Sequence, residues 1–585
     1  MDPLVEFPPH ALREYAFLAD GERGALIGPR GDVAWMCSPY WDSDAVFSTL
    51  IGGAGCFAVT PVDRFTWGGY YDRRSLIWNS RWTTAKGVIE SREALALPSN
   101  PRIAVVLRRI VAIEGSAHLR VVLDVRAGFG ADPMRGTHRD EDGTWTGQSG
   151  ATFFRWSGAP EARRSGTGPL TFHLELRAGE SRDLVLEVGD VPSFGGPWQP
   201  DALWNATEES WRNAIPEFDS RMLAPRDAER AMSVLFGMTS VHGGMVAAAT
   251  MSLPERAGQG RNYDYRYAWI RDQCYAGKAV ASHGHFPLLD SSVQFVSERL
   301  LADGPQLKPA YTARGGQVPG ERTLKHLTGY PGGADKVGNW VNQQFQLDAL
   351  GETLELLAAA SRHDRLDNEH WKAVEVAVAA IEARLSDADA GIWELDDQRW
   401  AHSRLTCVSG LRAIVTEAPN VQAGQWSSLA DAILADVSSD CLHPGGRWQR
   451  SPQDRAIDAS LLLPAIRNAL SPSDPRSLAT LATVEAELVQ DDYVYRFRPD
   501  ARPLGEAEGA FLLCGFLLAL AKNQQGDHLG ARVLFERNRG ACGTPGLLAE
   551  EFDVEQRQLR GNLPQAFVHA LLLECSAALA PRPAE

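Results

Sequence analysis

The run IAVVLRRIV at residues 103–111 decides the fold of the first part of the chain. It is short and mostly apolar, a pattern that is typical of a buried strand. The run HLRVVLDV at residues 118–125 repeats the pattern, and Gly, Pro and Asp clusters separate such runs. Asp142-Gly143 is a dipeptide of the kind that joins hairpin strands. Residues 1–200 are therefore predicted to form an N-terminal antiparallel β-sandwich.

Helical patterns replace the strand patterns near Pro197. Residues 201–225 are predicted to form a helical linker, and residues 226–585 a helical domain. About twelve helices in this domain fit a double-layered α/α barrel; a helical solenoid is the alternative, although the chain has no clean fixed-period repeat. The predicted fold class is α+β and multidomain. The clearest helical stretches are residues 226–241, 341–362, 369–385, 427–437, 456–470, 510–523 and 563–580.

The length and net charge of the chain limit its domain organisation and its possible partners. A chain of 585 residues is too long for one ordinary core, which agrees with two domains. Apolar residues make up 44% and charged residues 23%, which are ordinary values for a globular protein. The net charge of -16 argues against a nucleic-acid partner and against an anionic membrane surface. A neutral or cationic ligand remains compatible with this charge.

The first residues, the longest apolar stretch and the cysteines together predict the cellular location of the protein. Residues 1–7 lack the basic and apolar segments of a secretory signal, and the longest apolar stretch, residues 511–521, is too short to cross a bilayer. The eight cysteines form no CxxC pair and no Cys/His cluster. We expect reduced thiols in a cytoplasmic protein, with no metal site and no cofactor. The oligomeric state stays open, and a homo-oligomer is one alternative.

A segment rich in aromatic and charged residues indicates a sugar site. Residues 262–272, NYDYRYAWIRD, hold four aromatic residues, two arginines and two aspartates. Aromatic rings stack on the apolar face of a pyranose, and charged groups make directional hydrogen bonds to its hydroxyls. The alternative is a rim of aromatic residues and salt bridges at the start of a helix.

Two further segments supply candidate catalytic carboxyl groups. In residues 391–395, GIWEL, Glu394 directly follows a tryptophan, and an apolar wall that raises a carboxyl pKa suits a general acid. In residues 546–553, GLLAEEFD, a carboxylate could activate water. Most Trp-Glu pairs are structural, and an acidic run of this kind is more often a solvated loop.

Together these segments resemble glycoside hydrolase family 15, which includes glucoamylases, glucodextranases and the bacterial and archaeal trehalases of that family. The resemblance is close to full length, and residues 26–37 are similar to the opening of the sandwich domain in bacterial members. Residues 251–255, 344–348 and 564–567 match further family segments in the right order.

The resemblance implies an inverting, exo-acting mechanism on an (α/α)6 barrel. It implies that Glu394 is the general acid that protonates the glycosidic oxygen and that Glu550 is the general base that activates water. In inverting enzymes the two carboxyl groups stand about 6.5–9.5 Å apart, which leaves room for that water.

The resemblance also implies a set of substrate contacts. Arg271 and Asp272 match the pair that holds the non-reducing glucose, and Tyr265 and Trp269 match aromatic residues of the same subsite. For a substrate-binding arginine, Arg498 is the match, and Arg496 is the alternative alignment. The other residues expected at the substrate are Tyr330, Trp393 and Glu551.

The predicted function is release of β-glucose from the non-reducing end of a short α-glucoside. Trehalose, maltodextrin and isomalto-oligosaccharides all stay open, and the sandwich opening favours trehalose. Leu395 stands where fungal glucoamylases have a second Glu, so the preference for the leaving group is open as well. The alternatives are a phosphorolytic enzyme on the same fold and a non-catalytic sugar-binding protein.

Overall fold

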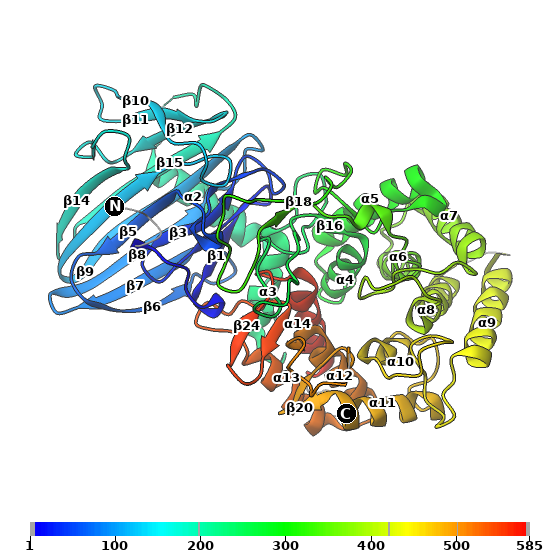
Figure 1. Cartoon of the computed structure of the whole chain (residues 1–585). Helices are drawn as coiled ribbons and strands as arrows, with labels where there is room; N and C mark the ends of the chain where they lie inside the picture. The colour runs from blue at the N-terminus through cyan, green and yellow to red at the C-terminus, as the bar shows by residue number, and fades with distance from the viewer. Residues whose placement is uncertain (1–5, 197–198, 419–421, 500, 581–585) are drawn as a thin grey trace.

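The computed structural model describes residues 6–196, 199–418, 422–499 and 501–580. Figure 1 shows a strand-rich N-terminal part beside a helical C-terminal part. The predicted order, an antiparallel sheet domain followed by a helical domain, is confirmed.

The strands of the N-terminal part pair antiparallel throughout, and they form one continuous hydrogen-bonded sheet. They are β1 (Ala16–Ala19), β2 (Gly24–Ile27), β3 (Asp32–Cys37), β4 (Ala45–Phe47), β5 (Cys56–Pro61), β6 (Phe65–Tyr71), β7 (Trp78–Thr84), β8 (Gly87–Leu95), β9 (Ile103–Asp124), β10 (Arg135–Arg139), β11 (Trp145–Ser149), β12 (Thr152–Ser157), β13 (Arg163–Arg164), β14 (Leu170–Arg177) and β15 (Ser181–Gly189).

Strand β9 joins the two halves of this sheet. The two apolar runs of the sequence lie on this single strand of 22 residues. Its first half pairs with β8 and β15, and its second half pairs with β5 and β14. Gly115, at the change of partners, has φ +68°, and a Cβ there would lie 2.1 Å from the Lys86 carbonyl oxygen, so the position needs glycine. Side chains of both halves, such as Val106 and Val121, share one buried core.

The helices follow from Pro200 onward. They are α2 (Pro200–Ala214), α3 (Pro225–Gly237), α4 (Ile270–Ala281), α5 (Phe286–Asp303), α6 (Asp348–Ser361), α7 (Asn368–Arg384), α8 (Ala401–Glu417), α9 (Gln422–Asp440), α10 (Leu463–Ile466), α11 (Pro475–Leu488), α12 (Leu512–Gln524), α13 (His528–Arg539) and α14 (Ala566–Ala578). Short strands lie in the loops between them: β16 (Ala268–Trp269), β17 (Ala310–Tyr311), β18 (Arg322–Thr323), β19 (Lys336–Val337), β20 (Val489–Gln490), β21 (Tyr493–Val494), β22 (Ala510–Phe511), β23 (Glu551–Asp553) and β24 (Gln558–Arg560).

The helices of the C-terminal part form two layers. Contacts run in a closed order from α4 to α6, α8, α10, α12, α14 and back to α4. Helices α3, α5, α9 and α13 each pack on a member of this ring, and α7 packs on α5 and α6. Inner helices are buried around their circumference, as Leu512–Ala521 of α12 shows. A closed inner ring with an outer layer is the arrangement of an α/α barrel.

Two predicted helices differ most from the bounds in the structure. The helix predicted from residue 341 begins at Asp348, because Gln344 has extended backbone angles that end a preceding 3-10 turn. The helix predicted at residues 456–470 is reduced to a 3-10 turn and the short α10. Asn468 has φ +61°, which ends the helical path there.

The two parts share a continuous apolar core. Phe17, Leu26 and Trp35 of the sheet belong to the same buried cluster as Met232 and Leu235 of α3. Polar contacts add to this core: the indole of Trp35 donates a hydrogen bond to the Ala249 carbonyl at 2.9 Å. Within the described residues, no helix is both long and apolar enough to span a membrane. All eight cysteines are free thiols.

Candidate active site

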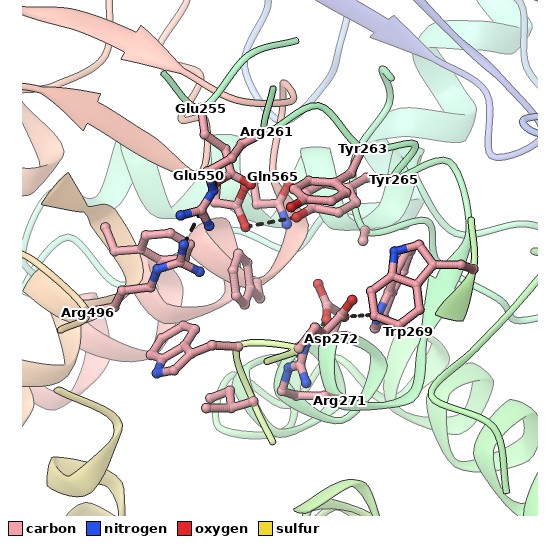
Figure 2. Close-up of a pocket in the computed structure, with 17 residues that line it drawn as sticks. Glu255, Arg261, Tyr263, Tyr265, Trp269, Arg271, Asp272, Arg496, Glu550 and Gln565 are labelled. Atoms are coloured by element: carbon pink, nitrogen blue, oxygen red, sulfur yellow. Dashed lines mark hydrogen bonds and ion pairs between the residues drawn. The ribbon is translucent and has the colours of Figure 1, made fainter. Parts of the chain in front are cut away.

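A pocket opens at the end of the inner ring where α4, α12 and α14 begin (Figure 2). The segment 262–272 supplies one wall of it, and the loop that carries Glu394 and the segment before β23 supply others. The lining residues are Ala247, Glu255, Arg261, Tyr263, Tyr265, Trp269, Arg271, Asp272, Trp340, Ile392, Trp393, Glu394, Arg496, Phe511, Glu550, Gln565 and Phe567.

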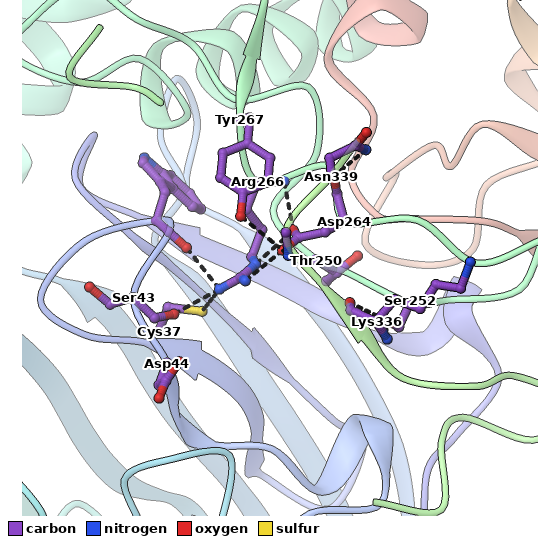
Figure 3. A network of polar contacts seen from close by, with 12 residues as sticks. Cys37, Ser43, Asp44, Thr250, Ser252, Asp264, Arg266, Tyr267, Lys336 and Asn339 are labelled. Carbon is purple, nitrogen blue, oxygen red and sulfur yellow. Dashed lines mark hydrogen bonds and ion pairs between the residues drawn. The ribbon is translucent and has the colours of Figure 1, made fainter. Parts of the chain in front are cut away.

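Aromatic residues of the segment 262–272 line the pocket. Tyr263 and Tyr265 are stacked with ring centroids 6.1 Å apart, and Tyr265 meets Trp269 edge-on at 5.5 Å. Arg266 is directed the other way, into the sheet domain (Figure 3). It donates hydrogen bonds to the carbonyl oxygens of Trp41 at 3.1 Å and Ser43 at 2.7 Å. The segment thus presents the rings of Tyr263, Tyr265 and Trp269 to the pocket, while Arg266 fixes it from behind.

Asp264 completes the support behind the rings. Its carboxylate accepts hydrogen bonds from the guanidinium of Arg266 at 2.7 and 2.9 Å and from the backbone N–H of Gly338 at 3.0 Å. Both side chains of the Asp264–Arg266 pair are fully buried. Removing one partner of such a buried pair strongly destabilises the folded protein, because the other charge is left buried and uncompensated.

Arg271 and Asp272 lie in the first turn of α4 and face the pocket floor. Arg271 donates a hydrogen bond to the side-chain oxygen of Gln346 at 2.9 Å, and its Nη1 lies 3.6 Å from a carboxylate oxygen of Asp348. Burial raises the pKa of Asp272 to about 6, against the opposing effect of Arg271. These contacts fix the arginine in place beside the Asp272 carboxyl group.

The loop between α7 and α8 presents Glu394. Asp389 organises this loop: its Oδ2 accepts hydrogen bonds from the backbone N–H groups of Leu347 and Gly391, both at 3.1 Å, and from the Ser403 hydroxyl at 2.8 Å. Glu394 has φ +56°, a left-handed conformation that costs free energy for a residue with a side chain. A tightly bonded loop therefore holds Glu394 in a strained backbone conformation.

The Glu394 carboxylate points at the wall that holds Trp269. It accepts a hydrogen bond from the Trp269 indole at 2.7 Å, and the guanidinium of Arg271 lies 3.7 Å away. The neighbouring Trp393 lines the pocket as well, and its indole N–H donates to the carboxylate of Asp458 at 2.9 Å.

Glu550 lies on another wall, directly before β23. One carboxyl oxygen is 3.5 Å from the Tyr265 hydroxyl. The side chain is buried, and burial raises the pKa of Glu550 well above its usual range, with a further increase from Glu255 and an opposing effect of Arg496. Glu394 and Glu550 thus line one pocket, each in contact with a ring of the segment 262–272.

Three predicted substrate contacts lie outside this pocket. The Tyr330 hydroxyl donates to the carbonyl of His10 at 2.8 Å, and its ring packs in the shared core. Arg498 is exposed and donates to the Glu487 carbonyl at 3.3 Å, whereas Arg496 lines the pocket in its place. Glu551 accepts the Gly509 N–H at 2.7 Å, since side chains alternate along a strand and β23 turns it away from Glu550.

Sequence reasoning missed several lining residues. Glu255 and Gln565 belong to segments 251–255 and 564–567, which had served only as marks of the resemblance. Arg261 directly precedes the segment 262–272, and Tyr263 is the first of its four aromatic residues. No local pattern distinguishes these positions, because the loops that bring them together are far apart in the chain. Within the part of the chain that is described, no group of three or more His, Cys, Asp or Glu side chains is placed to hold a metal ion.

Comparison with known proteins agrees with this architecture. The sequence-family model described as glycosyl hydrolases family 15 matches residues 232–577. A second family model, described as trehalase-like, N-terminal, matches residues 8–158. The trehalase of Mycolicibacterium smegmatis is 30% identical over 97% of this chain and 90% of its own length. The trehalase of Mycobacterium tuberculosis is 29% identical over 97% of this chain and 89% of its own length. Trehalase 1 of Sulfolobus acidocaldarius is 27% identical over 96% of this chain and 98% of its own length.

A solved structure shares the whole fold. A bacterial glucoamylase in complex with acarbose superimposes with a TM-score of 0.74 at 14% identity, over 98% of this chain and 94% of its own. The family match and the relatives named trehalase thus define the class of this protein as a glycoside hydrolase. Because the first family model covers more than half of the residues, the chain belongs to glycosyl hydrolases family 15.

Proposed function

We propose that this protein is an inverting hydrolase of trehalose that releases one β-glucose per cleavage, with Glu394 as general acid and Glu550 as general base. The observation that carries the proposal is that both carboxyl groups line one pocket together with Arg271 and Asp272. The relatives named trehalase, which match nearly the whole chain, support the choice of trehalose.

The contacts suit the chemistry in the following way. One glucose ring lies against Tyr265 and Trp269, and Asp272 and Arg271 hydrogen-bond its hydroxyls. Glu394 gives its proton to the glycosidic oxygen while Glu550 takes a proton from water that attacks the opposite face of the anomeric carbon. The free thiols support a reducing compartment, and we propose a cytoplasmic location.

The stereochemistry of the product tests this proposal. Trehalose joins two α-glucose units, so inversion at one anomeric carbon gives one β-glucose and one α-glucose. We expect proton NMR at early times to show equal amounts of the two anomers from trehalose, and slower release from maltose and isomaltose. Initial formation of α-glucose alone would indicate retention and contradict the roles of Glu394 and Glu550. Release from maltose but not from trehalose would exclude trehalose as the substrate.

A further inference from the structure

Glu255 is a second buried carboxyl group, and it lies beside Glu550 in the same pocket. It lines the pocket and is 3% exposed. A Cβ placed on Gly561 would lie 3.4 Å from an oxygen of Glu550 and 4.0 Å from Cγ of Glu255, so both side chains pack at the same backbone position. The Gly561 N–H donates to the Pro254 carbonyl at 3.0 Å, which fixes the segment that carries Glu255. Figure 2 shows the two carboxylates on the same wall.

Two arginines partly compensate the charge of Glu255. The Nε of Arg261 lies 2.7 Å from its carboxylate, and Nη2 of Arg496 lies 3.9 Å away. Glu508 binds the same two arginines, at 2.8 Å and 2.7 Å. The two arginines are therefore shared between two carboxylates, and Glu255 still raises the pKa of Glu550 while Arg496 opposes this effect. The titratable and charged groups that act on Glu255 or on which it acts are Arg261, Arg496, Glu394, Glu508, Glu550, Glu551, Tyr263 and Tyr265.

We propose that Glu255 is a positioning residue whose negative charge sets the basicity of Glu550, while its ion pair with Arg261 keeps that charge in place. This inference rests on the proposed role of Glu550 as the base. Glu255 itself neither gains nor loses a proton in the cleavage. The proton of the attacking water goes to Glu550, and the proton of Glu394 goes to the leaving oxygen.

The physical reason is repulsion between like charges in a buried site. A carboxylate beside a second carboxylate binds a proton more tightly, and a base of raised pKa takes the proton of water more readily. Burial raises the pKa of Glu255 to about 7, with Arg496 opposing this effect. Above that pH Glu255 is charged and acts on Glu550.

The test compares two substitutions of opposite sign. In Glu255→Gln the repulsion is lost, so the acid limb of the kcat/KM profile for trehalose should move to lower pH by about one unit. The plateau of kcat should fall about three- to tenfold because the base is weaker. In Arg261→Gln the compensating positive charge is lost, so the acid limb should move to higher pH. This second variant also decides the matter if the first does not fold.

Asp553→Asn is the matched control. It removes the 2.8 Å ion pair between Asp553 and Arg256, which ties the same loop to β23, and it leaves the charge of Glu255 intact. The acid limb should not move in this variant. Acid limbs that stay in place in both Glu255→Gln and Arg261→Gln would show that Glu255 only anchors the loop, and would overturn the inference alone. A fully active Glu550→Gln would overturn the base assignment, and the inference with it.

Discussion

In the proposed mechanism Glu394 and Glu550 handle different protons, so the two substitutions should respond differently to a change of leaving group. Glu394→Gln and Glu550→Gln should each lower kcat on trehalose by about 10²- to 10⁴-fold. On α-glucosyl fluoride, whose leaving group needs no proton, Glu394→Gln should recover most of its rate and Glu550→Gln should not. Steady-state kinetics on both substrates measures this. Equal losses on both substrates for Glu394→Gln would exclude it as the acid.

At the scale of single residues, the sequence indicated fewer than half of the residues that line the pocket. Tyr265, Trp269, Arg271 and Asp272 lie together because one short segment carries them, and a motif describes such a segment well. Glu551 lies outside the pocket lining because the direction of its side chain depends on the alternation along β23. Tyr330 and Arg498 depend on the paths of long loops, which periodicity does not describe.

The loop that carries Glu394 allows a prediction at the level of one structural element. Burial raises the pKa of Asp389 to about 8, and Asp348 adds to the effect. The unfolded chain loses this proton near pH 4, whereas the folded chain keeps it until about pH 8. The free energy of unfolding should thus fall as pH rises across this window. In Asp389→Asn the decline should be smaller.

Thermal unfolding of both proteins at pH 5 and pH 8 measures this difference. The melting temperature of the natural chain should fall more between pH 5 and pH 8 than that of Asp389→Asn. The reason is that the buried carboxyl group of Asp389 must ionise as the pH rises, whereas the amide of the variant does not titrate. Ser403→Ala, which removes one hydrogen bond to the same oxygen, serves as a control that lowers stability at both pH values. A constant difference between Asp389→Asn and the natural chain would contradict the prediction.

Among the elements, the long helices and strands were predictable and their ends were not. The apolar pattern at residues 103–111 and 118–125 correctly indicated strands, but it did not show that Gly115 continues one strand between them. β9 changes its pairing partners at this interruption. The length of α10 was overestimated, because buried apolar residues continue beyond both ends of this short helix.

In the whole molecule, the Asp264–Arg266 pair joins the segment 262–272 to the sheet domain. Arg266→Met leaves Asp264 buried without its partner, which should cost about 3–5 kcal/mol of unfolding free energy. Because the two parts share one core, we expect a single unfolding transition in both proteins, shifted as a unit. Calorimetry and denaturant unfolding measure this. Two separate transitions, with only one of them shifted, would show that the parts fold independently.

Asp264→Asn combined with Arg266→Met is the matching control, since it removes both charges and should recover part of the loss. The two-part organisation was predictable because strand and helix patterns occupy separate stretches of sequence. The closed order of the inner ring was not, since contacts such as that between α14 and α4 join segments far apart in the chain.

The inner ring has an electrostatic consequence, because helices α4, α12 and α14 all begin at the pocket. The aligned peptide dipoles of a helix place about half a positive elementary charge at its N-terminus. Several such ends therefore direct a positive field at the carboxyl groups of the pocket floor. A neutral sugar that displaces water lowers the local dielectric constant and strengthens this field. The same loss of water makes an ionised carboxylate less favourable, so the helix N-termini would offset part of that cost for the carboxylate that must accept a proton.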